Sequence, residues 1–437
     1  MFDSYAKAKR KIAGEYLSSN YTIFKKVRLG LIVKKTSVTR FLGYYFVLCF
    51  ISNIVHPITP AFLQSIGSPD SMFGIAFATM AIANFLMAPF WGTFGDRYGY
   101  VKGLSVACFG YTCGQLVFSQ ANGPELVLLG RFIAGGFLSG HAVNVMAYLA
   151  TDAEDNQSKA KYMALFAALT SVGAALGYFI GGFLGDFALN AWQSVRPVFY
   201  VQAIGLFSGI ALIWPWVGEL QVQRSAEPFR LSQINPLRSI MKSAPLIKGP
   251  LALFLLISFL TSFATNAQDQ SFNYFLRAQL KFPPSYNGVF KAIVGLIALT
   301  ANLTLNIWLS RRTDLRKSII PVLLMCSVSL VFLVVVESQI LFFISALVFY
   351  IFNAIYLPMQ QGLIVRNTSG SKGEISGLFN AIKALGMCLG PLFSGLVFAQ
   401  NPKLPFIAAL FAFLIAGILS VYNRRQYIQA EQRIESI

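Results

Sequence analysis

Few side chains in this sequence can carry a charge or a proton within its apolar stretches, so these few are the first candidates for chemistry. The chain has only two histidines, His56 and His141, and each lies one helical turn from an asparagine, Asn53 and Asn144. Histidine is the side chain that exchanges a proton most readily near neutral pH. Both histidines can take part in proton coupling or serve as hydrogen-bonded structural residues, and the sequence leaves the two interpretations open.

Arginine, lysine and aspartate interrupt the apolar stretches at other points. Arg131 lies in LVLLGRFIAGGFLSG, Lys383 in NAIKALGMCLG and Asp269 in TNAQDQSFNYF. An ionisable group within an apolar span costs several kcal/mol unless it faces water or a partner, so each is a functional candidate. For Arg131, a structural role against backbone carbonyls is the alternative. Lys291 lies near one end of its stretch, from which its ammonium group can extend to a membrane surface.

Long apolar segments must position these side chains. Hydrophobic residues make up 56% of the chain, charged residues only 12%, and the mean hydropathy is +0.61, values typical of membrane proteins. Each apolar segment is long enough to cross the ~30 Å hydrocarbon layer as a helix. The twelve expected spans are 41–66, 71–95, 103–121, 124–150, 160–184, 198–217, 249–275, 284–309, 317–336, 339–365, 374–399 and 403–423.

Basic residues are distributed unevenly between the two ends of these spans. Because the number of spans is even, both termini are expected on one side. Of the 35 Lys and Arg residues, four fall at the opposite side, three lie in the interior of spans away from their ends, and the others fall on the side of the termini. The positive-inside rule therefore predicts cytoplasmic termini and a multi-pass location in the cell membrane. The net charge of +18 then reflects topology, and no nucleic-acid partner is expected.

An internal repeat divides the chain into two related halves. SKAKYMALFAALTSVGAALGYFIGG, from Ser158, aligns without a gap with SKGEISGLFNAIKALGMCLGPLFSG, from Ser371, so the fifth and eleventh spans are copies. Small residues let helices approach closely, and we expect this role for Gly173, Gly177, Gly181, Gly386 and Gly390.

The repeat also sets the expected domain order. We predict a basic cytoplasmic tail (1–40), an N-terminal bundle (41–217), a cytoplasmic central loop (218–248), a C-terminal bundle (249–423) and a cytoplasmic tail (424–437). The fold class is therefore an all-α polytopic membrane protein, with twelve transmembrane helices in two pseudo-symmetric six-helix bundles.

Patterns for catalysis, metal binding or nucleotide binding are missing from the sequence. The five cysteines lie in apolar spans without a C-x-x-C pair, so they are expected to be free packing residues and not metal ligands. No Walker motif indicates ATP-driven pumping. We therefore expect no enzyme activity, no metal and no cofactor.

A charged, glycine-rich segment, WGTFGDRYGYVKGL (91–104), separates the second span from the third. It lacks the G-x-x-x-x-G-K-[ST] pattern of a phosphate-binding loop. Its charges and glycines instead resemble the loop between spans 2 and 3 of the major facilitator superfamily. The residues that carry this resemblance are Gly92, Gly95, Asp96, Arg97, Gly99 and Lys102.

Three further segments are similar to the same superfamily. They are Arg131 followed by glycines in span 4, GAALGYFIGG (173–182) in span 5, and PITPAFL (57–63) at the end of span 1. The last two resemble its twelve-span drug:proton antiporter group, although Tyr178 stands where that group usually has proline. The resemblance implies the major facilitator fold, halves that rock about a central site, and a cytoplasmic latch formed through Asp96.

Together these observations predict a monomeric secondary transporter in the lipid bilayer that binds a small molecule. Proton-coupled efflux of a drug-like molecule by alternating access is the first interpretation. The alternatives are uptake or exchange of an organic anion or sugar, and a non-transporting receptor or scaffold. The excess of intramembrane cations over acids favours a neutral, zwitterionic or anionic substrate. The candidate cavity or coupling residues are Asn53, His56, Arg131, His141, Asn144, Asp269, Asn353, Gln360 and Lys383.

Overall fold

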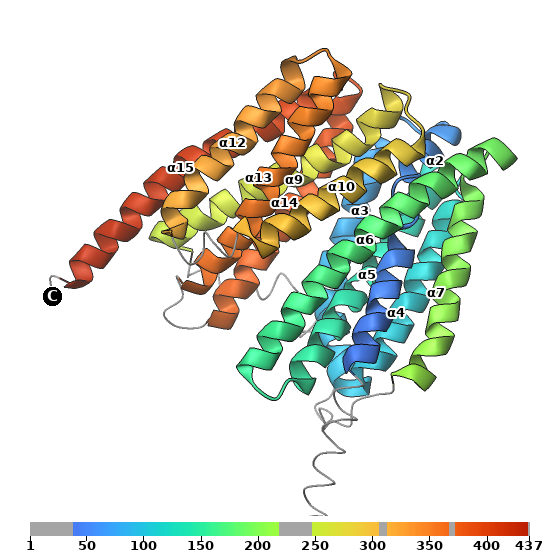
Figure 1. The fold of residues 1–437 in the computed structure, drawn as a ribbon, viewed down its shortest axis with the longest axis horizontal. Coiled ribbons are helices and arrows are strands. Elements are labelled where there is room, and N and C mark those ends of the chain that lie inside the picture. The colour runs from blue at the N-terminus through green and yellow to red at the C-terminus, as the bar shows by residue number, and fades with distance from the viewer. Residues whose placement is uncertain (1–37, 218–246, 306–312, 367–371, 436–437) are drawn as a thin grey trace, which may run out of the picture.

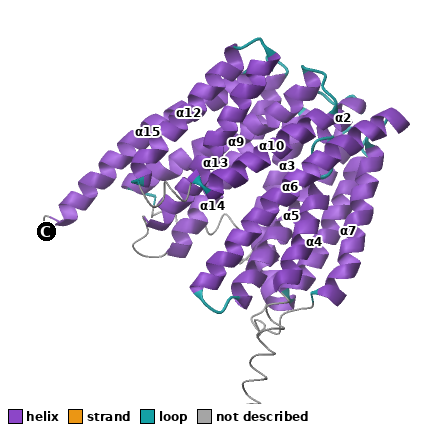
Figure 2. Ribbon diagram, in the orientation of Figure 1, coloured by secondary structure: helices purple, strands orange, loops and turns teal. Residues whose placement is uncertain are grey.

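The computed structural model describes residues 38–217, 247–305, 313–366 and 372–435. Within these ranges the regular structure is helical throughout and contains no strand (Figure 2). The N-terminal tail as far as residue 37 and most of the central loop lie outside the described residues. The helices of the N-terminal half are a segment over 38–53, α2 Thr59–Ser65, α3 Met72–Tyr98, α4 Tyr100–Ser119, α5 Pro124–Asp152, α6 Asn156–Trp192 and α7 Arg196–Trp216. Those of the C-terminal half are α9 Gly249–Ala278, α10 Pro284–Leu303, α12 Leu315–Val335, α13 Gln339–Arg366, α14 Lys372–Phe398 and α15 Leu404–Glu435.

These helices confirm the all-α membrane prediction. Among the described residues, nine helices are long and apolar enough to cross a membrane. The segment 38–65, α4 and α10 occupy the three other predicted spans. Figure 1 shows the blue-to-green helices of the first half grouped beside the yellow-to-red helices of the second.

The first span is not one continuous helix. A helix over 38–53 is followed by turns over 54–58, and α2 then begins at Thr59. Pro57 and Pro60 explain this break, because proline donates no backbone hydrogen bond and its ring clashes with the preceding helical turn. The break lies beside His56, which therefore sits where the backbone is irregular.

Two helices extend furthest beyond the predicted spans. α6 begins at Asn156, because the Asp155 carboxylate caps it by accepting the Ser158 N–H at 2.7 Å. That hydrogen bond lowers the pKa of Asp155. α15 continues to Glu435 through most of the expected C-terminal tail, and Arg424 pairs there with Asp314 at 3.6 Å.

The repeat is visible in how the duplicated helices pack. In the first half, Gly173 and Gly177 of α6 lie against the backbone of the first span at Phe46 and Phe50. In the second half, their counterparts Gly386 and Gly390 of α14 lie against the backbone of α9. Gly181 extends the first contact to Ile54. Equivalent glycines thus contact equivalent helices.

The two halves meet most tightly towards one end. We call the end that carries residues 38 and 435 the terminal end, and the opposite end the distal end. At the distal end, Gly74 of α3 approaches the backbone of Pro391 and Gly395 in α14 so closely that a Cβ atom on Gly74 would overlap it. Gly182 of α6 and Gly288 of α10 make the second such contact.

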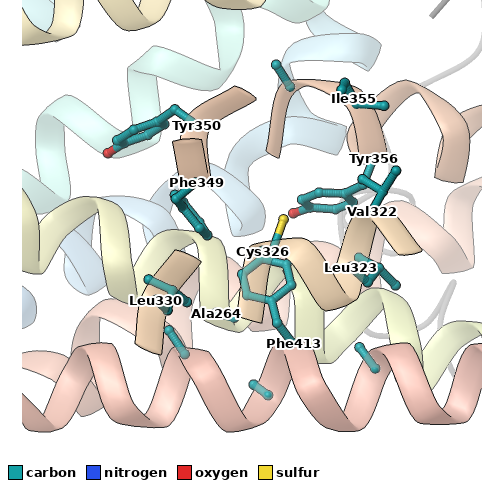
Figure 3. Close-up of a cluster of buried hydrophobic side chains, with 14 of the residues drawn as sticks. Ala264, Val322, Leu323, Cys326, Leu330, Phe349, Tyr350, Ile355, Tyr356 and Phe413 are labelled. Carbon is teal, nitrogen blue, oxygen red and sulfur yellow. The ribbon is translucent and has the colours of Figure 1, made fainter. Parts of the chain in front are cut away.

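An aromatic core fixes the second half. α12, α13, α15 and α9 bury Leu323, Cys326, Tyr356 and Phe413 among their neighbours (Figure 3). Tyr350 lies at the edge of this cluster, and its hydroxyl points away from the Phe413 ring (Figure 3). The packed rings hold this hydroxyl in place, because interiors are close-packed and rotamers are restricted.

Candidate functional site

A small polar cavity lies between the two halves, towards the distal end. Its volume is about 40 Å³, and its walls come from the first span, α3, α5, α6 and α9. Apolar side chains form much of the lining. The polar and aromatic lining residues most relevant here are His56, Thr59, Arg131, Tyr178, Gln270 and Asn273. We call this space the central cavity.

Arg131 is the buried cation of the central cavity. Only 4% of the residue is exposed. Its guanidinium donates to Thr59 Oγ1 at 3.2 Å and lies 3.8 Å from the centroid of the Phe118 ring. A desolvated cation over an aromatic face gains about 2 kcal/mol, which offsets part of the cost of burial. Within the described residues Arg131 forms no ion pair, so its positive charge is available to an anionic group.

Small residues bring the helices around Arg131 close together. A Cβ atom on Gly130 would overlap the backbone of Phe118 in α4, and one on Gly135 would overlap the backbone of Met80 in α3. The short guanidinium–Phe118 contact depends on this close approach of α5 and α4. The glycines that flank Arg131 in the sequence therefore position its side chain.

His56 faces the central cavity from the break in the first span. Its ring stacks on Tyr178 of α6, with centroids 5.4 Å apart and planes inclined by 17°. Tyr178 occupies the position where the resembled antiporter group has proline, and here it forms part of the cavity wall. Asn53 donates to Cys49 O at 2.7 Å and packs against Gly177, so its contacts are local to the helix pair.

An ion pair lies beside the central cavity in the second half. Lys291 of α10 contacts the Asp269 carboxylate of α9, and Tyr350 of α13 donates its hydroxyl hydrogen to Asp269 Oδ1 at 2.6 Å. Lys291 also donates to the Tyr350 hydroxyl at 3.1 Å. The Lys291 side chain is 7% exposed and the Asp269 side chain 26%. The carboxylate is thus the more accessible member of this group.

The prediction that Lys291 reaches a membrane surface is wrong. Its ammonium group turns inwards because Asp269 and Tyr350 compensate its charge, which is more favourable than leaving the carboxylate unpaired within the bundle. Asp269 is also next to the central cavity, since Gln270 follows it and Asn273, one turn on, lines the wall. In the sequence, this ion pair was indicated by the opposite charges of Asp269 and Lys291 in adjacent spans.

Three of the other candidates lie apart from the central cavity. His141 packs edge-on against Tyr111 inside the first half, with ring centroids 5.2 Å apart. Asn144 lies between α3 and α4, where its side chain fills the space left by Gly95 and Gly103. Gln360 donates to Thr261 Oγ1 at 3.0 Å within the second half.

The last two candidate residues, Asn353 and Lys383, also lie away from the central cavity. Asn353 is buried in α13, with 6% of the residue exposed. Lys383 lies in the middle of α14, towards the terminal end from the central cavity. The structure therefore brings His56 and Arg131 together, with Asp269 alongside, and disperses the remaining candidates.

The segment over 91–104 is not the loop that its glycines predict. α3 continues to Tyr98, α4 begins at Tyr100, and Gly99 alone joins them with φ +107°. Only glycine adopts that conformation without strain. Gly95 and Gly103 are instead contact points for Asn144. The Tyr100 hydroxyl donates to Asp96 Oδ1 at 3.0 Å, which holds the carboxylate at the terminal end of the first half.

A second space, which we call the terminal groove, separates the halves on the terminal side of the glycine contacts. It has a volume of about 330 Å³ and lies between Asn84–Pro89 of α3 and Gly377–Met387 of α14. The same two helices touch at Gly74 and Gly395 near the distal end. The interface of α3 and α14 is therefore closed at one end and open towards the other.

Metal-ligating residues do not cluster in the described part of the chain. No group of three or more His, Cys, Asp or Glu side chains lies within reach of one ion there. The five cysteines are free thiols. The polar groups of the central cavity are suited to hydrogen bonding and charge recognition.

The chain is similar to known membrane transporters in sequence. The model of a family described as Major Facilitator Superfamily matches residues 41–391. Multidrug resistance protein 2 of Bacillus subtilis is 22% identical over 397 residues, which cover 90% of this chain and 96% of that protein. Quinolone resistance protein NorA of Staphylococcus aureus (strain MRSA252) is 23% identical, covering 86% and 93%.

Solved structures share the fold. A bacterial homologue of the human lysosomal transporter Spinster, in an inward-facing and unoccupied conformation, superposes with a TM-score of 0.71 at 14% identity, covering 91% of this chain and 98% of that one. The human organic anion transporter MFSD10 superposes with a TM-score of 0.62 at 18% identity, covering 89% and 99%.

Proposed function

Since the chain belongs to the Major Facilitator Superfamily, we propose that this membrane transporter exports a small organic molecule in exchange for protons by alternating access. One observation carries the proposal. The halves are joined by tight backbone contacts at the distal end, are separated by the terminal groove, and enclose a polar cavity with an ionisable network between them. Drug-resistance relatives that align along most of the chain support efflux of a drug-like molecule.

The distribution of basic residues supports the orientation. With cytoplasmic termini in the cell membrane, the terminal end faces the cytoplasm and the open groove corresponds to an inward-facing state. A monomer is sufficient for this mechanism, because the cavity is built within one chain. The surrounding bilayer covers the exposed apolar side chains of the spans.

The Asp269 group supports proton coupling. A proton on Asp269 neutralises the charge that holds Lys291, and a deprotonated carboxylate restores the pair. Asp269 lies next to lining residues of the central cavity, so the arrangement links protonation to the interface between the halves. His56, stacked on Tyr178 in the cavity wall, is the second group that can exchange a proton there.

Gly74→Ala is expected to shift the protein towards the outward-facing state. The added methyl group would overlap the α14 backbone only while the distal end is closed. Overpacking costs about 1–3 kcal/mol, which corresponds to a population shift of roughly 5- to 150-fold. The measurement is the rate at which an impermeant maleimide, applied from the terminal side, alkylates a cysteine placed at Asn380, with the native cysteines replaced.

The matched control is Gly43→Ala, because a Cβ atom at Gly43 would meet no other group within 4 Å. Slower alkylation in Gly74→Ala and unchanged alkylation in the control support the closed distal contact as a gate. Alkylation at the parental rate in both variants would mean that the Gly74 contact is not specific to this state.

The segment over 91–104 is proposed to latch the terminal ends when they close. Asp96 sits at that end, bound in this state to the Tyr100 hydroxyl of its own half. A carboxylate can exchange this contact for a cation of the other half, because charge-assisted hydrogen bonds form and break with the approach of the partner. The glycines and cations of the segment permit and support that approach.

Asp96→Asn is accordingly expected to slow turnover about tenfold, because one charge-assisted contact contributes ~1.5 kcal/mol, with little change in substrate affinity. Transport rate in vesicles and affinity in detergent are measured on the same preparation. Glu125→Gln, which removes a carboxylate near the distal end, is the control. An equal loss of affinity and turnover in Asp96→Asn would assign Asp96 to binding instead.

The proposed function itself is tested first by ligand screening. A thermal-shift panel of drugs, organic acids and sugars on the purified protein identifies binders, and each binder is then added to reconstituted vesicles that contain a pH-sensitive dye. A substrate-dependent change of internal pH supports proton-linked transport. Binding without any flux or pH change across the panel would favour a receptor or scaffold.

A further inference from the structure

Lys383, in the middle of a membrane-spanning helix, has no counter-ion in the described part of the chain. The residue is half-buried in α14, and its Nζ atom lies 5.3 Å from the centroid of the Phe379 ring. Its backbone oxygen accepts a hydrogen bond from Ser262 of α9 at 2.7 Å. Among the described residues no carboxylate pairs with the ammonium group. A charge in such a place is costly unless it has a partner.

The position of Lys383 on its helix places it at the edge of the terminal groove. α14 presents Gly386 and Gly390 to the backbone of α9. Asn380 and Met387, each about one turn from Lys383, line the groove. Lys383 therefore stands between the face of α14 that contacts α9 and the face that borders the space between the halves.

The lining of the terminal groove is mostly apolar. Phe85, Ala88 and Ala384 provide apolar surface, and the two amides Asn84 and Asn380 provide hydrogen-bonding groups. Its volume of about 330 Å³ compares with about 40 Å³ for the central cavity. That size lies at the lower end of the range of small-molecule sites, roughly 300–1,000 Å³. The groove thus combines an apolar wall and two amides, and Lys383, which pairs with no carboxylate among the described residues, lies beside it on α14.

We propose that the terminal groove is the cytoplasmic binding site for an amphipathic organic anion, which is the substrate class of the transporter. The acidic group of the ligand pairs with Lys383, and its apolar part lies along Phe85 and Ala384. The transport of the anion rests on the proposed function, whereas its binding to the terminal groove does not. Arg131, also without an ion-pair partner among the described residues, provides a second cation deeper between the halves. A cationic ligand would be repelled at both positions.

The test uses three ligands that share one ring system and differ in charge: 2-naphthoate, 2-naphthylmethanol and 2-naphthylmethylammonium. The full-length protein is placed in nanodiscs of neutral phosphatidylcholine, and dissociation constants are measured by equilibrium dialysis. We expect naphthoate to bind at least about tenfold more tightly than the alcohol, as a charge-assisted hydrogen bond implies. Lys383→Met should remove this preference, and Lys383→Arg should retain it.

The control variant is Lys403→Met, which removes the same charge at the distal end, where Lys403 donates to Val334 O. Equal affinity of the parental protein for naphthoate and the alcohol would overturn the proposal, as would equal losses in Lys383→Met and Lys403→Met. Displacement of naphthoate by phosphatidylglycerol in the nanodisc would assign the groove to a lipid headgroup and also overturn it.

Transport measurements separate this inference from the proposed function. Selective, Lys383-dependent binding of naphthoate with no proton-linked flux in vesicles would contradict the proposed function and leave the anion site standing. Proton-linked flux of the ammonium ligand that is unchanged in Lys383→Met would contradict the anion site and leave the transport mechanism standing. Proton-linked flux of naphthoate that is lost in Lys383→Met supports both.

Discussion

Asp269→Asn is expected to abolish transport driven by a pH gradient. Asparagine keeps the shape of aspartate but cannot exchange a proton, so the Lys291–Tyr350 group no longer responds to protonation. The variant also leaves Lys291 buried without a counter-ion, and removing one partner of a buried pair costs about 3–5 kcal/mol. The free energy of unfolding should therefore fall together with coupled transport.

A double variant separates these two effects. Asp269→Asn combined with Lys291→Met removes the unpaired charge, so thermal stability should recover while pH-driven accumulation of substrate stays absent. The measurements are the unfolding temperature and substrate accumulation in vesicles with an imposed pH gradient. Accumulation at the parental level in either variant would exclude Asp269 as the coupling carboxylate.

Arg131→Ala is expected to lower transport about 10- to 100-fold, because a hydrogen bond to a charged group contributes ~1.5–3 kcal/mol. Arg131 is the buried cation of the central cavity, held by Thr59 and the Phe118 ring and without a carboxylate partner in the described part of the chain. The loss should appear mainly as weaker binding of an anionic substrate, and Arg131→Lys should restore part of it.

Arg196→Ala is the matched control for this variant. Arg196 also lies over an aromatic ring, 5.9 Å from the Phe62 centroid, and donates to Ala121 O at 3.0 Å, but it does not line the central cavity. Both arginines contribute to stability, and only Arg131 should affect affinity for substrate. Similar losses of affinity in the two alanine variants would indicate a structural role for Arg131.

The architecture was largely predictable from the sequence, because it depends on local composition and on duplication. Apolar length predicted the twelve spans, and the aligned segments from Ser158 and Ser371 predicted the two related halves. Pro57 and Pro60 explain the break near His56, although the first span was predicted as one continuous helix over 41–66. The glycines of 91–104 wrongly predicted a loop, because most of them serve helix contacts and only Gly99 has a positive φ.

The site was less predictable, because it depends on which helices become neighbours. The depth of Arg131 and His56 in their spans suggested candidates, and the structure places both at the central cavity. Asp269 and Lys291 lie in adjacent spans, but their pairing and the approach of Tyr350 require the packing of α9, α10 and α13. Asn144 resembled a cavity residue in sequence, yet its surroundings are the glycines of neighbouring helices.

The most direct test of proton-coupled alternating access is substrate accumulation driven by a pH gradient alone. The protein is reconstituted into sealed vesicles with an acidic lumen. Uptake of a ligand identified by thermal shift is then measured, and the molecules that contribute are those whose terminal face points out of the vesicle. We predict accumulation above the external concentration, collapse of that accumulation by nigericin, and no accumulation in Asp269→Asn combined with Lys291→Met. Equilibration to the external concentration, independent of the pH gradient and identical in the double variant, would contradict the mechanism.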